Sequence, residues 1–89
     1  MIESRPATPV EIATAPYQNR HPATQHLLRW LVPNPYLEGI AANVSQAVWH
    51  LTEYMVHKLG DGPELSAGLR HLREAKDCFV IQALEDSCK

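Results

Sequence analysis

Two long segments with the apolar spacing of helices are separated by only Gly60, Asp61 and Gly62. The first segment covers about residues 37–59, and the second covers about residues 61–83. A helix of that length is roughly 35 Å long, and so short a connection forces its neighbour to fold back beside it. The sequence therefore predicts an all-α fold built around a long antiparallel helical hairpin.

Each segment carries one apolar stripe, and the two stripes are expected to form the seam of the hairpin. The stripe of the first segment repeats at three- and four-residue steps: Leu37, Ile40, Val44, Val48, Leu51, Met55 and Leu59. The stripe of the second consists of Leu65, Leu69, Leu72, Phe79 and Ala83, with Lys76 where another apolar residue is expected. Four large apolar residues fall off both stripes and predict a second interface, with another protomer or with a ligand: Trp30, Trp49, Val56 and Val80.

Short-range signals predict where the two long helices meet. Gly60 is expected to supply the left-handed residue that ends the first helix. Asp61 is expected to be the N-cap of the second helix, because Pro63 suits a first turn and Glu64 can reach back to the cap.

The chain before the hairpin is rich in proline. A shorter helix is expected at about residues 22–32, ended by the two prolines that follow it. Residues 1–20 contain prolines at positions 6, 9 and 16, and this spacing predicts an extended or disordered arm rather than a helix. The sequence thus divides into an arm at residues 1–20 and a helical hairpin domain at residues 21–89.

A chain of 89 residues is small for a stable single copy. Such a chain buries only about 60% of the surface that its unfolded form exposes. Cys78 and Cys88 would lie about 15 Å apart on one helix, beyond disulfide reach, so association of protomers is the expected reinforcement. The net charge of -2 provides no overall positive field for DNA, RNA or a membrane surface. The short apolar runs predict a cytosolic protein without a membrane span.

Side chains typical of catalysis or metal binding form no recognisable pattern. His50 and His57 would lie two turns apart, about 11 Å, which is too far for one metal ion. Neither long segment contains the Glu-x-x-His motif of di-iron proteins. Ser45, Ser66 and Cys78 fall inside predicted helices rather than on a strained turn beside a base. The sequence therefore predicts neither an enzyme nor a bound metal or cofactor.

A polar row borders the apolar stripe of the last predicted helix: Ser66, Arg70, Arg73 and Asp77. One interpretation is a solvated face with ion pairs between Arg70 and Glu74 and between Arg73 and Asp77. The other is an anion site near the N-terminus of that helix.

Lys76 also has two interpretations. Its amine either reaches the edge of the hairpin or a carboxylate, or it enters a polar cavity between protomers. Such a cavity would favour a compact anion such as a phosphodiester.

Two segments of the chain resemble a family of small phage proteins. They are H-P-A-T-Q-H-L-L at positions 21–28 and D-G-P-E-L-S-A-G-L-R-H-L-R-E-A-K-D-C-F-V at positions 61–80. Residues 68–72 followed by Glu74, Ala75 and Lys76 are similar to the A-L-x-H-L-x-E-A-K run of that family's last helix. The family comprises the nucleotide-sequestering anti-CBASS sponges, with a helical hairpin domain that is shared with anti-Thoeris sponges. The resemblance covers residues 21 to about 84.

This resemblance implies a homo-oligomer, a compact hexamer of helical hairpins, that acts in the host cytoplasm. Such proteins bind cyclic di- or trinucleotides in pockets between protomers and starve the immune effector without degrading the ligand. The residues expected to bind the ligand are Ser45 and Gln46 in one pocket and Ser66, Arg70, His71 and Lys76 in another. Tyr36 and Trp49 are the expected stacking partners of the bases.

The chain departs from the family pattern at three places. Relatives carry F-E-Y where this chain has residues 31–33, V-S-K-P-F where it has residues 44–48, and often a basic residue in place of Ile81. Gln46 thus replaces a lysine, and one charge-assisted hydrogen bond is worth roughly 1.5–3 kcal/mol. Two other hypotheses stay open. In the first, the chain is a small oligomeric structural or adaptor protein that contacts another protein and has no small-molecule site. In the second, it is an enzyme that degrades such nucleotides.

Overall fold

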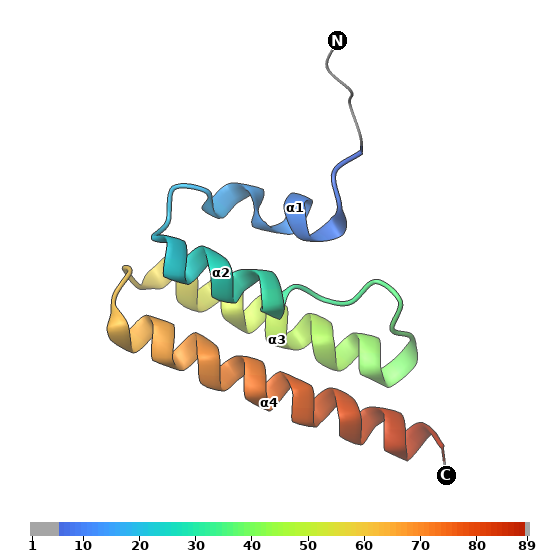
Figure 1. Cartoon of the computed structure of the whole chain (residues 1–89). Helices are drawn as coiled ribbons and strands as arrows, with labels where there is room; N and C mark the ends of the chain where they lie inside the picture. Colours follow the sequence, from blue (N-terminus) through green and yellow to red (C-terminus); the bar gives the residue numbers. More distant parts are fainter. Residues whose placement is uncertain (1–5, 89) are drawn as a thin grey trace.

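The computed structural model describes residues 6–88, and the regular structure of this range is entirely helical (Figure 1). The predicted all-α class and the two long packed helices are confirmed. The elements in order are α1 (Pro9–Thr14), the 3-10 segment η1 (Ala15–Tyr17), α2 (Pro22–Leu31), α3 (Gly39–Lys58) and α4 (Pro63–Ser87).

The helical hairpin of α3 and α4 is covered on one side only. α2 packs against both helices, and α1 packs on α2 (Figure 1). The resulting molecule is flat, with principal extents of 48 × 40 × 16 Å. The core lies where α2, η1 and the inner sides of the hairpin meet: Tyr17, Leu27, Leu28, Leu31, Val32, Val48, Trp49, Val56, Leu65 and Leu69.

The buried side of α3 is not its most hydrophobic side. Its buried residues are Ala41, Ser45, Val48, Trp49, Thr52 and Val56. Of the stripe that was predicted to form the seam, only Val48 is buried, and Leu51 is 44% exposed. The prediction that Trp49 and Val56 lie outside the core is therefore wrong. The physical reason is that α2 and η1 cover α3 as well as α4, and they bury the row next to the predicted one.

The predicted stripe of α4 is buried only in part. Leu65, Leu69 and Ala83 are buried, whereas Phe79 is 57% exposed. Lys76 belongs to the buried row and is only 8% exposed. The charge at this position is therefore a feature of the interior, and its partners are described below.

The connection between α3 and α4 differs from the prediction at both of its caps. Gly60 is not left-handed, because Gly39, with a φ of 62°, is the only described residue whose φ lies in the left-handed region. Asp61 is not the N-cap of α4, since Gly62 occupies that position. Asp61 instead accepts hydrogen bonds at the start of α2, from the His21 amide at 3.0 Å and the Thr24 hydroxyl at 2.8 Å. Amides at a helix N-terminus lack intrahelical acceptors and attract a carboxylate.

Arg20 completes this cluster and ties the segment before α2 to the hairpin turn. Its Nε donates to Asp61 Oδ1 at 3.0 Å, and its terminal nitrogens donate to the carbonyls of Val56 at 2.6 Å and Leu59 at 2.9 Å. These carbonyls lie at the C-terminal end of α3, where a cation is favourable. The hydrogen bonds to Asp61, first from the His21 amide and then from Thr24 and Arg20, lower the pKa of its carboxyl.

Residues 9–17 are helical, in contrast to the extended arm predicted for residues 1–20. Pro9 lies in the first turn of α1 and Pro16 in the first turn of η1, where proline needs no hydrogen-bond donor. Thr8 caps α1 by accepting a hydrogen bond from the Glu11 amide at 3.1 Å. The prolines therefore start helices here rather than prevent them. Residues 1–5 of the predicted arm lie outside the described residues.

Tyr17 anchors this N-terminal segment to α3. Its hydroxyl donates to Glu53 Oε2 at 3.0 Å and lies 3.2 Å from His57 Nε2. Its ring packs edge-on against Trp49, with the ring centroids 6.4 Å apart. Burial, together with the hydrogen bond to Glu53 and the charge of that residue, raises the pKa of Tyr17 to about 12.

Candidate functional site

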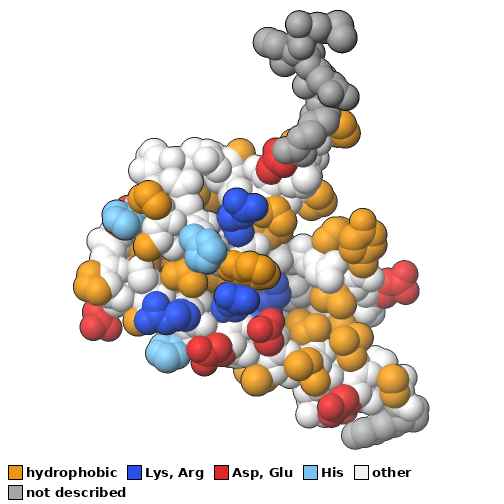
Figure 2. Space-filling view, viewed as in Figure 1, with side chains coloured by type: hydrophobic (Ala, Val, Ile, Leu, Met, Phe, Trp, Pro, Cys, Tyr) orange, Lys and Arg blue, Asp and Glu red, His pale blue; other side chains and the backbone are white. Residues whose placement is uncertain are grey.

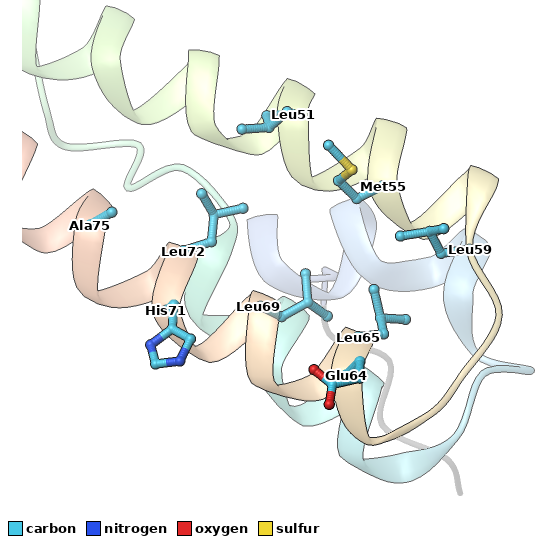
Figure 3. Close-up of a pocket in the computed structure, with 10 residues that line it drawn as sticks. Leu51, Met55, Leu59, Glu64, Leu65, Leu69, His71, Leu72 and Ala75 are labelled. Carbon is cyan, nitrogen blue, oxygen red and sulfur yellow. The ribbon is translucent and has the colours of Figure 1, made fainter.

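An apolar groove runs between α3 and α4 on the side of the hairpin away from α2. At the end near the hairpin turn, side chains of the two helices point toward one another (Figure 3): Leu51, Met55 and Leu59 from α3, and Leu65, Leu69 and Leu72 from α4. The groove continues along the hairpin between Ile40, Val44 and Ala47 of α3 and Phe79 and Ala83 of α4. Both parts share Leu51 and Leu72, so the groove is continuous.

The groove offers apolar contact and little else. Its two parts enclose volumes of about 520 and 470 Å³. Only Glu64 and His71 are polar in the first part, and only Gln82 and Asp86 in the second. An exposed apolar surface of this length, framed by polar residues, is typical of a binding interface. This surface carries most of the residues that were predicted to form the seam of the hairpin, and we call it the hairpin groove.

The rim of the hairpin groove holds an ion pair that differs from the predicted one. Glu74 was expected to pair with Arg70, but its Oε2 lies 3.9 Å from His71 Nδ1. His71 lies at the rim of the groove, with its ring on the side of α4 away from α3 (Figure 3). His71 and Glu74 are both well exposed, so this pair contributes little to stability.

The side of the molecule that carries α2 is different in character. Here the guanidinium carbon of Arg73, from α4, lies 4.2 Å from the ring centroid of Trp30, from α2. Arg29 and Arg70 are exposed on the same two helices. Figure 2 shows Lys and Arg side chains gathered around apolar side chains near the middle of this view. We call Arg29, Trp30, Arg70 and Arg73 the basic patch.

Lys76 lies beneath the basic patch and binds the end of α2. Its Nζ donates to the carbonyl oxygens of Trp30 at 3.1 Å and Val32 at 3.0 Å. These carbonyls have no intrahelical partner because α2 ends at Leu31. Burial lowers the pKa of Lys76; nearby Asp77 opposes this shift and Arg73 adds to it. The ammonium thus meets neither a carboxylate nor the hairpin edge, and its predicted contact with a ligand stays a prediction.

The other residues that were predicted to bind a ligand are not brought together within one chain. Trp49 and Ser45 are buried in the core. Gln46 is exposed on α3, where its amide lies 3.0 Å from His50 Nε2, and Tyr36 is 90% exposed in the connection between α2 and α3. Ser66 lines a small hollow beside Asp61. Two of the predicted stacking and hydroxyl groups, Trp49 and Ser45, are therefore inaccessible to a ligand without a change in the core.

The hydroxyl of Ser45 is fully buried without a hydrogen-bond partner among the described residues. Thr52, which is also buried on α3, differs because its hydroxyl donates to the Val48 carbonyl at 2.7 Å. An unpaired buried hydroxyl costs about 1–3 kcal/mol.

The described residues hold no cluster of three or more His, Cys, Asp or Glu side chains suited to a metal ion. Cys78 and Cys88 are both exposed and form no disulfide. Within residues 6–88, no helix combines the length and the hydrophobicity that a bilayer crossing requires.

Sequence reasoning missed the pairing of Trp30 with Arg73. Each residue carried a signal, since Trp30 falls off the apolar stripes and Arg73 belongs to the polar row of α4. Their contact depends on how α2 crosses α4, and no local spacing encodes that crossing. The hairpin groove was missed for a similar reason, because its residues were assigned to the core.

Comparison with known proteins gives no further guide, since no family model, curated protein or solved structure matches this chain.

Proposed function

We propose that this chain is a self-associating binding protein that sequesters cyclic oligonucleotide second messengers without degrading them. In this proposal it acts as a phage counter-defence protein, as the resemblance of residues 21–28 and 61–80 implies. The observation that carries the proposal is the hairpin groove, because it makes a second copy of this chain the expected partner. The basic patch and the resemblance support the choice of an anionic ligand.

The hairpin groove suits a second copy of the same chain. Each copy presents two long apolar rows, so a symmetric pairing lets the rows of one hairpin fill the groove of the other. Leu51 is 44% exposed, and full burial of a leucine is worth about 1.5–3 kcal/mol, so covering it contributes about 0.7–1.3 kcal/mol per copy. Several such residues line the groove. Association of copies through it therefore supplies stability that a single 89-residue chain lacks.

The charged groups around α4 suit a phosphodiester ligand. Arg70 is exposed, Arg73 stacks on an aromatic ring, and Lys76 adds positive charge beneath them. The chain as a whole carries a net charge of -2, so positive charge is concentrated rather than general. A local concentration of this kind favours a compact anion over a long nucleic acid.

Two variants of similar exposure test the association. Leu51→Asp places a carboxylate in the hairpin groove, whereas Leu84→Asp does so at a leucine that is 46% exposed and does not line the groove. Native mass spectrometry should find an oligomer of the 10.0 kDa chain for the wild type and for Leu84→Asp, and a monomer for Leu51→Asp. A monomeric wild type, or equal effects of both variants, would overturn association through this groove.

Calorimetry with a panel of cyclic di- and trinucleotides tests the ligand. The proposal predicts tight binding by the wild type, weaker binding by Arg70→Ala, and recovery of the intact nucleotide after the protein is denatured. An altered nucleotide would indicate a degrading enzyme. An oligomer that binds none of the panel would favour the adaptor hypothesis, in which the same groove or another face contacts a different protein.

A further inference from the structure

A hollow lies between α1 and α2 directly beside Trp30. It is lined by Thr8, Val10, Glu11, His26, Arg29 and Trp30. None of the residues that line this hollow belongs to the predicted set of ligand residues. It adjoins the basic patch, because Arg29 and Trp30 belong to both.

The aromatic ring of Trp30 forms one wall of this hollow, and contacts with α4 hold it in place. The side chain is 51% exposed, although tryptophan usually buries most of its large ring. The Arg73 guanidinium lies over the ring at 4.2 Å, and the Trp30 carbonyl accepts a hydrogen bond from Lys76 at 3.1 Å. Both the ring and its backbone are thereby fixed by α4. A fixed, half-exposed ring offers a stacking surface at little further cost in side-chain entropy.

Two arginines and one carboxylate lie close to this ring. Arg29 lines the same hollow, Arg73 lies on the ring, and His26 is at the wall. Glu74, which follows Arg73 in the chain, pairs with His71 on the outer side of α4. Asp77 acts on Lys76, and Glu11 contributes one carboxylate to the α1 side of the hollow. An aromatic ring that carries one guanidinium group on its face, beside a hollow lined by a second arginine, matches a ligand that has a flat base and a phosphate.

We infer that this hollow binds a nucleotide unit, with the base stacked on Trp30 and its phosphate at Arg29 and Arg73. This deepens the proposed function and rests on it, since it takes the captured ligand to be a cyclic oligonucleotide. It places the base-stacking surface within one chain, at Trp30 rather than at Tyr36 or Trp49. The association of copies through the hairpin groove is not required for this contact, because α1 and α2 lie on the other side of the hairpin.

The test measures binding of cyclic di-AMP, cyclic di-GMP and cyclic triadenylate by calorimetry. Trp30→Leu should weaken binding about 5- to 150-fold, the range for loss of one base–aromatic stack. Trp30→Phe retains a stacking ring and should keep most of the affinity. Arg29→Gln and Arg73→Gln should each weaken binding about 10- to 100-fold, whereas Lys58→Gln, on the far end of α3, should leave it unchanged. Arg29 is exposed, so its variant tests the site without disturbing the core.

A second readout uses the two tryptophans of the chain. Trp30 is half-exposed and Trp49 is buried, so stacking should quench only the Trp30 fraction of the fluorescence. Trp30→Phe should abolish the quenching while binding persists. A single-stranded tetranucleotide, tested in place of the cyclic ligand, shows whether the stacked base can also come from a linear nucleic acid. We expect only the cyclic ligand to bind.

The outcomes separate this inference from the proposed function. If cyclic nucleotides bind and Trp30→Leu, Arg29→Gln and Arg73→Gln leave the affinity unchanged, the site lies elsewhere and only this inference fails. If no cyclic nucleotide binds the wild type, the proposed function fails and this inference fails with it. If the tetranucleotide binds more tightly than the cyclic nucleotides, the assignment of a cyclic ligand is wrong, whereas the stacking site at Trp30 stands.

Discussion

Replacement of Lys76 by methionine tests the most unusual feature of the interior. Methionine has nearly the same length and fills the same space, so Lys76→Met removes the amine without leaving a cavity. The carbonyls of Trp30 and Val32 then lose their donor. Because these carbonyls end α2, the variant probes how α2 is held on the hairpin, and with it the position of the Trp30 ring.

The expected cost is about 2–4 kcal/mol of unfolding free energy. A buried acceptor left unsatisfied costs about 1–3 kcal/mol, and the Val32 bond is buried, whereas the Trp30 bond is only partly buried. The lost attraction between a cation and the C-terminus of α2 adds about 0.3–1 kcal/mol. Relief of the burial that lowers the pKa of Lys76 offsets part of this cost. For a domain of this size, 2 kcal/mol corresponds to a fall in Tm of about 8–16 °C.

Thermal unfolding at a fixed protein concentration measures this difference, with Lys58→Met as the control. Lys58 is exposed and lies 5.7 Å from the centre of the Tyr54 ring, so its loss should cost less than about 1 kcal/mol. Equal stability of Lys76→Met and the wild type would refute the argument. It would mean that the cost of burying the amine cancels its two hydrogen bonds, as for some buried ion pairs.

The pH dependence of the same pair gives a second check. The folded pKa of Lys76 lies below its ordinary value of 10.5, so at alkaline pH the folded chain releases this proton before the unfolded chain does. The wild type therefore gains stability from this group as pH rises through the folded pKa toward 10.5. A neutral amine still donates two hydrogen bonds. The gap in stability between the wild type and Lys76→Met should widen over this window, and a gap that closes would contradict the assigned direction.

Two further predictions concern the groups that hold the N-terminal segment. The pKa of Tyr17 is raised from 10.0 to about 12, so its stabilising effect is complete below pH 10 and is lost as pH rises toward 12. Tyr17→Phe should be less stable at neutral pH and should lack this alkaline loss in denaturant unfolding; an unchanged profile would argue against the contact with Glu53. The pKa of Asp61 is lowered below 3.8, so its contribution is present above that pH and fades as pH falls through the folded pKa. Asp61→Asn should flatten the acid limb of the stability curve, and parallel acid limbs would rule out this role.

The elements of the fold follow from local signals in the sequence. The apolar spacing of α3 and α4 and the three residues between them specify two long helices that fold back on each other. The prolines were harder to interpret, because proline stops a helix from within and starts one at its first turn. Pro9 and Pro16 belong to the second case only because Thr8 supplies a cap and Tyr17 finds a pocket on α3.

The choice of buried face could not be derived from spacing. The stripe with the largest side chains was expected inside, but α2 selects the neighbouring row, in which Ala41, Ser45 and Thr52 allow close approach. Long-range polar contacts were equally hidden, because Arg20 and Asp61 are 41 residues apart and Lys76 is 46 residues from Trp30. Each of these contacts satisfies a helix end, and which end meets which side chain is a property of the assembled fold.

The distribution of residues across the hairpin supplies the strongest physical reason for the proposed association. The interior of this chain holds Ser45, Thr52 and the amine of Lys76, while Ile40, Leu51 and Phe79 line the outer groove. A single copy thus places polar groups inside, where each must find a partner, and leaves larger apolar side chains in water. Such an arrangement lowers the stability of an isolated chain of this size. Covering the outer groove removes its apolar side chains from water and adds stability. Because the basic patch lies on the opposite side of α4, copies that join through the groove leave the Trp30 ring accessible. The proposed association and the proposed capture of an anion therefore use different surfaces of the same molecule.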